Sequence, residues 1–150
     1  MKPARPLPLV LLAGAVALFG WLLLDTWTRR GALPPPLPWT APVGTVGLAL
    51  AVLAAGLPVR RWVRGGREHR MDPLLAARTA VFAKAGAYVG ALLAGWYLAQ
   101  AIDLLPDLVG TRRTRLVLAL AAAAAAVALS GAGLLVQRWC RVPPRDDEES

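Results

Sequence analysis

Long apolar runs alternate with short charged segments along the chain. Four runs without a charged residue have lengths of 18, 29, 18 and 22 residues: Leu7–Leu24, Gly31–Val59, Ala85–Ile102 and Leu116–Gln137. About 20 residues of helix cross the hydrocarbon of a bilayer, whereas a soluble bundle shows polar residues along the outer face of each helix. We therefore predict an all-α, polytopic membrane protein with one domain over residues 1–140 and four transmembrane helices, spanning about 7–27, 41–58, 74–105 and 115–138.

The third predicted helix is longer than a bilayer requires. It starts at Asp72-Pro73, where the aspartate is a helix cap and the proline suits the first turn. From Pro73 to Leu105 a continuous helix measures roughly 50 Å, against about 30 Å of hydrocarbon. Lys84 interrupts the apolar part 19 residues before Asp103, a rise of roughly 28 Å.

Two interpretations of Lys84 follow from this placement. If Asp103 marks the outer interface, Lys84 lies near the inner edge of the hydrocarbon, and its long stem reaches the headgroups. If the helix tilts instead, Lys84 enters the bundle with Tyr88, one turn further on the same face. A buried lysine needs a carboxylate partner or a depressed pKa. The apolar runs contain no carboxylate.

The basic residues are concentrated on one side of the predicted membrane bundle. The formal net charge is +8, with 17 basic residues. Most of these residues lie near the two termini or around the loop between the second and third predicted helices. The loops that follow the first and third predicted helices contain five: Arg29, Arg30, Arg112, Arg113 and Arg115. This asymmetry predicts both termini and the middle loop in the cytoplasm (N-in/C-in) of a bacterial plasma membrane. The polar tail 141–150, with its four acidic residues, is then cytoplasmic and expected to be disordered. We expect anionic lipid headgroups, and not nucleic acid, to be partners of the middle basic loop, with contacts from Arg60, Arg61 and Arg64.

Composition adds little chemistry to this picture. Apolar residues make up 57 % of the chain, the mean hydropathy is +0.51, and Cys140 is the one cysteine. A single cysteine excludes an internal disulfide and a cysteine-based metal cluster. The predicted spans lack the paired acids, histidine clusters or Ser/Cys/His sets that catalysis requires. We therefore expect no enzyme activity, no catalytic or metal-binding residues and no cofactor.

Small residues recur at helical spacing in the third span. Gly86, Gly90 and Ala94 form one stripe, and a neighbouring stripe comprises Ala83, Ala87, Ala91 and Gly95. Such stripes allow two helix backbones to approach closely in lipid. We expect them to pack inside one chain, with a dimer interface as the alternative. The alanine tract 121–126 in the fourth span is likewise expected to lie against other helices, and Ser130 can bond to a carbonyl of its own helix.

Several motifs spread along the chain resemble one family. They are Lys-Pro-x-Arg-Pro from Lys2, Pro-Pro-Leu-Pro-Trp over Pro35–Trp39, Asp-Pro-Leu-x-Ala-Ala-Arg over Asp72–Arg78, Lys84 with Tyr88 and Gly95-Trp96-Tyr97, and Cys-Arg-Val-Pro-Pro from Cys140 followed by acids. Together they resemble the membrane-protein family of high-GC Gram-positive bacteria known as domain of unknown function 3180. The resemblance implies four membrane helices and a plasma-membrane location, and it implies no activity, substrate or catalytic residue.

The expected function is a non-enzymatic membrane scaffold or accessory subunit, whose partner is another membrane protein or a second copy of the chain. The alternative is a small oligomeric transporter or channel that uses the face of Lys84 and Tyr88. The candidate functional or lipid-facing residues are Lys84, Tyr88, Arg78 and Asp103.

Overall fold

The computed structural model describes residues 5–33, 36–65, 73–107 and 109–140. Within them lie four helices: α1 (Pro6–Arg29), α2 (Thr40–Gly65), α3 (Pro73–Leu104) and α4 (Thr111–Trp139). Each is long and apolar enough to cross a membrane. The all-α architecture with four candidate spans is therefore confirmed. The predicted cap Asp72 and the predicted tail 141–150 lie outside the described residues.

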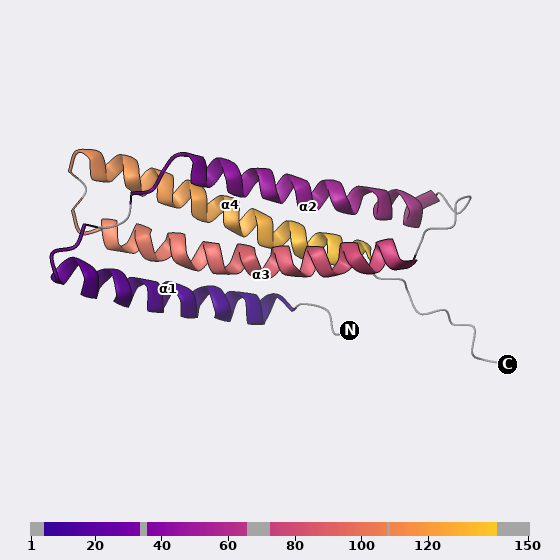
Figure 1. Ribbon diagram of the computed structural model, residues 1–150, viewed down its shortest axis with the longest axis horizontal. Coiled ribbons are helices and arrows are strands. Elements are labelled where there is room, and N and C mark those ends of the chain that lie inside the picture. The colour runs from indigo at the N-terminus through magenta and orange to yellow at the C-terminus, as the bar shows by residue number, and fades with distance from the viewer. Residues whose placement is uncertain (1–4, 34–35, 66–72, 108, 141–150) are drawn as a thin grey trace.

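The four helices pack in the order α1, α3, α4, α2, so that neighbours in space are not neighbours in sequence (Figure 1). α3 and α4 form the centre of the row, α1 packs mainly on α3, and α2 packs mainly on α4. The first described residues, the last described residues, the end of α2 and the start of α3 all lie at one end of the bundle (Figure 1). We call it the arginine end, after Arg5, Arg60, Arg61, Arg64, Arg78 and Arg138. The opposite end, with Asp25, Asp103 and Asp107, is the aspartate end.

The second helix extends further than its apolar run. From its sequence, this span is predicted to end at about 58 and the following arginines to lie in a loop, but α2 continues through Pro58 to Gly65. The loop assignment of Arg60, Arg61 and Arg64 is therefore wrong, since all three lie on the helix. A proline removes one backbone donor, and transmembrane helices tolerate that loss where neighbouring helices support the backbone. Arg112, Arg113 and Arg115 likewise lie in α4, which begins at Thr111.

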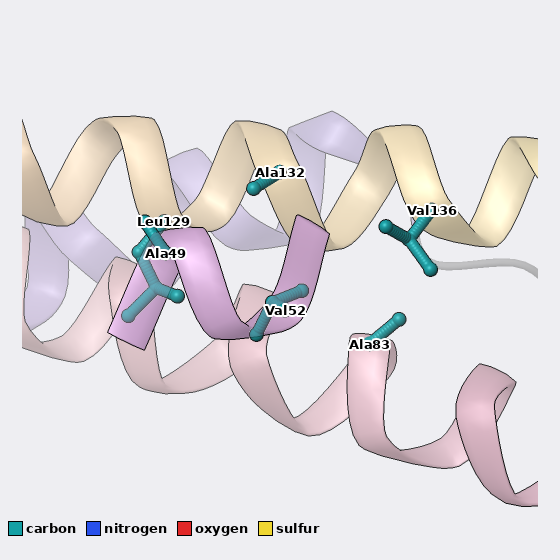
Figure 2. Close-up of a cluster of buried hydrophobic side chains, with 6 residues drawn as sticks. All are labelled: Ala49, Val52, Ala83, Leu129, Ala132 and Val136. Atoms are coloured by element: carbon teal, nitrogen blue, oxygen red, sulfur yellow. The ribbon is translucent and has the colours of Figure 1, made fainter. Parts of the chain in front are cut away.

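The bundle is held together by alanine and glycine more than by large side chains. Six buried residues of α2, α3 and α4 form one cluster (Figure 2): Ala49, Val52, Ala83, Leu129, Ala132 and Val136. The α3–α4 contact is close enough that a Cβ on Gly90 would lie 2.6 Å from the backbone nitrogen of Ser130. A Cβ on Gly133 would lie 2.7 Å from the nitrogen of Ala87. Since lipid supplies no hydrophobic drive between helices, such close contacts stabilise the bundle through dispersion.

The same contacts show where the small-residue stripes of α3 pack. Gly90 faces α4, Gly86 faces Val52 of α2, and Gly95 faces the backbone of α1 at Ala13. The alanine tract also packs inside the chain, with Ala122, Ala123, Ala125 and Ala126 buried. The prediction that these small residues pack within one chain is confirmed.

Ser130 connects two helices. Its hydroxyl donates a hydrogen bond of 2.8 Å to the carbonyl oxygen of Ala87 on α3. The expectation that Ser130 bonds within α4 is wrong, because the close α3–α4 approach brings a carbonyl of the neighbouring helix within reach. Thr45 and Thr79 do bond within their own helices, to the carbonyl oxygens of Ala41 and Leu75.

Candidate functional site at the arginine end

Lys84 lies level with the start of α1. Leu9 packs in one cluster with Ala87 and Ala91, and α1 and α3 run in the same direction (Figure 1). Pro6, three residues before Leu9, is therefore about level with Lys84. The lysine is half-buried and has no hydrogen bond or ion pair with a described residue. Beyond this level α3 continues without α1 beside it.

Tyr88 and Arg78 have different surroundings. Tyr88 packs against the cluster that Leu9 of α1 forms with Ala87 and Ala91 of α3, so this part of the Lys84/Tyr88 face lies beside the start of α1. Arg78 lies further towards the arginine end and is exposed. It borders a shallow, almost wholly apolar hollow of about 440 Å³ together with Ala77, Val81, Phe82 and Ala85.

Asp103 is at the opposite end of the bundle. It is half-buried near the end of α3, at the end where Asp25 forms a 2.8 Å ion pair with Arg29 and Asp107 lies 3.5 Å from Arg112. The four candidate residues Lys84, Tyr88, Arg78 and Asp103 are thus not brought together into one site.

The last turns of α2 form a second hollow, which we call the α2 groove. It is open, measures about 500 Å³, and is lined by Leu57, Arg60, Arg61, Arg64 and Gly65. The guanidinium carbon of Arg60 lies 4.9 Å from the ring centroid of Trp139 on α4. This distance is typical of a cation–π contact. The Nε of Arg60 is fully buried and has no hydrogen-bond partner among the described residues.

The outer face of α2 is a feature that the sequence analysis missed. Gly44, Gly47, Ala51 and Ala54 are exposed and recur at helical spacing, on the side of α2 opposite the buried Ala49, Val52 and Val59. A Cβ on Gly44 or Gly47 would have nothing within 4 Å. We call this set the α2 small face. The spacing can be read from the sequence. Spacing alone, however, does not show whether another helix packs against the stripe.

Cys140 directly follows α4 and packs against the buried cluster of Figure 2, and burial raises the pKa of its thiol above the ordinary value. A raised pKa leaves less thiolate at neutral pH, and thiolate is the nucleophile. We expect maleimide to label the folded protein in mild detergent more slowly at pH 7 than the same chain in denaturing detergent. The difference should shrink as the pH rises. Because Cys140 is the one cysteine of the chain, mass spectrometry measures its rate of labelling directly. Equal labelling rates in the two detergents at pH 7 would refute the prediction.

In the part of the chain that the structure describes, no three residues of the His, Cys, Asp or Glu types come together. The fold and its charged ends define the class: a polytopic protein with four candidate membrane-spanning helices. The chain belongs to the family described as protein of unknown function (DUF3180), whose model matches residues 9–144. No match was found among curated proteins or among solved structures.

Proposed function

We propose that the protein is a non-enzymatic accessory subunit of the bacterial plasma membrane, with both termini in the cytoplasm, that holds a further transmembrane helix against the α2 small face. The observation that carries this proposal is the contrast between two sets of glycines. Gly86, Gly90 and Gly95 meet neighbouring helices, whereas Gly44 and Gly47 meet nothing.

Small residues have a cost and a use in lipid. A glycine inside a helix is about 1 kcal/mol less favourable than alanine, and it offers lipid chains little surface for dispersion contacts. Its advantage is close approach of a second backbone, which strengthens packing and weak hydrogen bonds between helices. The α2 small face has the same residue types as the inner stripes, and its steps of three and four residues keep it on one side of the helix, so a partner helix is its most economical explanation.

The position of Lys84 supports an accessory role over transport. A half-buried lysine level with the start of α1 reaches headgroups by extending past Pro6. Tyr88, its companion in the transporter alternative, packs against the cluster that Leu9 of α1 forms with Ala87 and Ala91 of α3. No observation on the described residues favours a solute path along this face.

The test is site-specific photo-crosslinking in native membranes. A benzophenone amino acid at Gly47 is expected to give a protein adduct of defined mass. The matched control is the same probe at Val46, an exposed neighbour about 100° around the helix, which should give lipid adducts only. In a second step, Gly44 carries the probe and Gly47→Leu is added. This change should abolish the adduct without lowering the melting temperature, because open space surrounds Gly47.

Failure to form any protein adduct at Gly47, or equal adducts at Gly47 and Val46, would contradict the proposal. An adduct between two copies of the chain would identify the partner as a second copy.

A further inference from the structure

The α2 groove concentrates positive charge on one surface. Arg60, Arg61 and Arg64 line a single hollow of about 500 Å³, with neighbouring positions on one helix. Like charges at such spacing repel one another. None of the three forms an ion pair with a described residue, and the described carboxylates, Asp25, Asp103 and Asp107, all lie at the aspartate end. Among the described residues, no carboxylate therefore balances this triple charge.

One of the three arginines is held in place. The Arg60 guanidinium lies over the Trp139 ring at 4.9 Å, and its Nε is buried without a partner. Stacking thus fixes the side chain, and no hydrogen bond to a described residue uses its terminal nitrogens. A guanidinium held in this way is prepared to donate paired hydrogen bonds to an oxyanion, with less loss of side-chain freedom than a free arginine.

The depth of the groove in the bilayer fits a lipid headgroup. Gly56 faces Val136 and Gly133 faces Ala83, so Arg60 lies roughly 10 Å beyond the level of Lys84 along the bundle axis. With Lys84 near the edge of the hydrocarbon, the backbone of Arg60 lies at the outer boundary of the headgroup layer, which is roughly 5–8 Å thick on each side, and its long side chain reaches back to the headgroup phosphates. Leu57 adds an apolar wall on the side nearer the hydrocarbon.

We propose that the α2 groove binds the phosphate monoester headgroup of a membrane lipid in a single, saturable site. Planar guanidinium groups match phosphate oxygens in paired hydrogen bonds. A monoester approaches two negative charges at neutral pH, which offsets three arginines better than the single charge of a phosphodiester. The site differs from diffuse attraction between a basic surface and anionic lipid, because it depends on the arrangement of particular side chains. It does not depend on the docking of a partner helix at the α2 small face.

The test uses the full chain in neutral detergent, titrated with dioctanoyl phosphatidate and followed by native mass spectrometry. We expect one bound lipid at saturation, and weaker binding of the corresponding phosphatidylglycerol. R61Q/R64Q changes two exposed side chains and should weaken binding about tenfold or more, the usual effect of losing charge-assisted hydrogen bonds. W139L keeps every charge but removes the stacking surface of Arg60, and should weaken binding about threefold. The melting temperature of each variant shows whether it is folded.

The matched control is R112Q/R113Q, which removes the same charge from the aspartate end and should leave binding unchanged. If both double variants weaken binding equally, net charge alone explains it and the proposal is wrong. Equal affinity for glycerol 3-phosphate, which has the headgroup without chains, would assign the groove to a soluble ester and overturn the lipid assignment. Binding that appears only after D146N/D147N/E148Q/E149Q would show that the chain's own acids exclude the lipid, and would also overturn it.

Discussion

Gly90→Leu is expected to destabilise the bundle strongly, because Gly90 is buried where α3 meets α4. A Cβ at this position would lie 2.6 Å from the nitrogen of Ser130 and 2.8 Å from the carbonyl oxygen of Ala126. Both atoms belong to the backbone of α4, which cannot yield as a flexible side chain does. Separation of the helices would also break the hydrogen bond from Ser130 to Ala87. Overpacking of this kind costs about 3 kcal/mol, and thermal unfolding in mild detergent measures it.

Gly131→Leu provides the matched control for this prediction. Gly131 is next to Ser130 on α4, but a Cβ there has nothing within 4 Å. Its replacement should change stability by no more than about 0.5 kcal/mol. Equal destabilisation by the two variants would mean that α3 and α4 do not approach through Gly90.

Gly95→Leu is expected to release α1 from the bundle. The added side chain would meet the backbone of Ala13 and the Cβ of Val16 at 2.9 Å. Among the described residues, α3 is the one helix with which α1 makes extensive contact, so the α1–α3 interface is what holds α1 in the bundle. The other three helices keep their mutual contacts, and the expected result is a local opening at the α1–α3 interface rather than general unfolding.

Cysteine protection measures this opening directly. In a Cys140→Ser background, Leu9→Cys should resist maleimide in detergent, since Leu9 is only 4 % exposed. Addition of Gly95→Leu should make it reactive. Leu11→Cys, at a position that is 65 % exposed, should react alike in both backgrounds. A Leu9→Cys that stays protected in the presence of Gly95→Leu would contradict the packing of α1.

The number and approximate position of the helices were predictable because uncharged runs of sufficient length have few alternatives in lipid. The ends were less predictable. Arg60, Arg61 and Arg64 look like loop residues, since charge marks the limit of hydrocarbon. A helix, however, continues into the headgroup layer at no cost in backbone hydrogen bonds. Hydropathy therefore locates the hydrocarbon and not the end of the helix.

The candidate site was less predictable than the fold, because it depends on which helices are neighbours. Small-residue spacing occurs in α2 as well as in α3, yet only the α3 stripes are covered by this chain. The order α1, α3, α4, α2 decides this, and no sequence pattern specifies that order. The contact of Arg60 with Trp139 joins residues of α2 and α4. It could not be predicted from the sequence, because it also depends on which helices are neighbours.

The most direct test of the account is the accessibility of single cysteines in intact cells. In a Cys140→Ser background, Leu33→Cys, at a 94 % exposed position between α1 and α2, should react with a membrane-impermeant maleimide added outside. Gly65→Cys, at the end of α2, should react only after the cells are opened. Four crossings with both termini in the cytoplasm require this pair of results. Labelling of Gly65→Cys in intact cells, with Leu33→Cys protected or equally labelled, would contradict it.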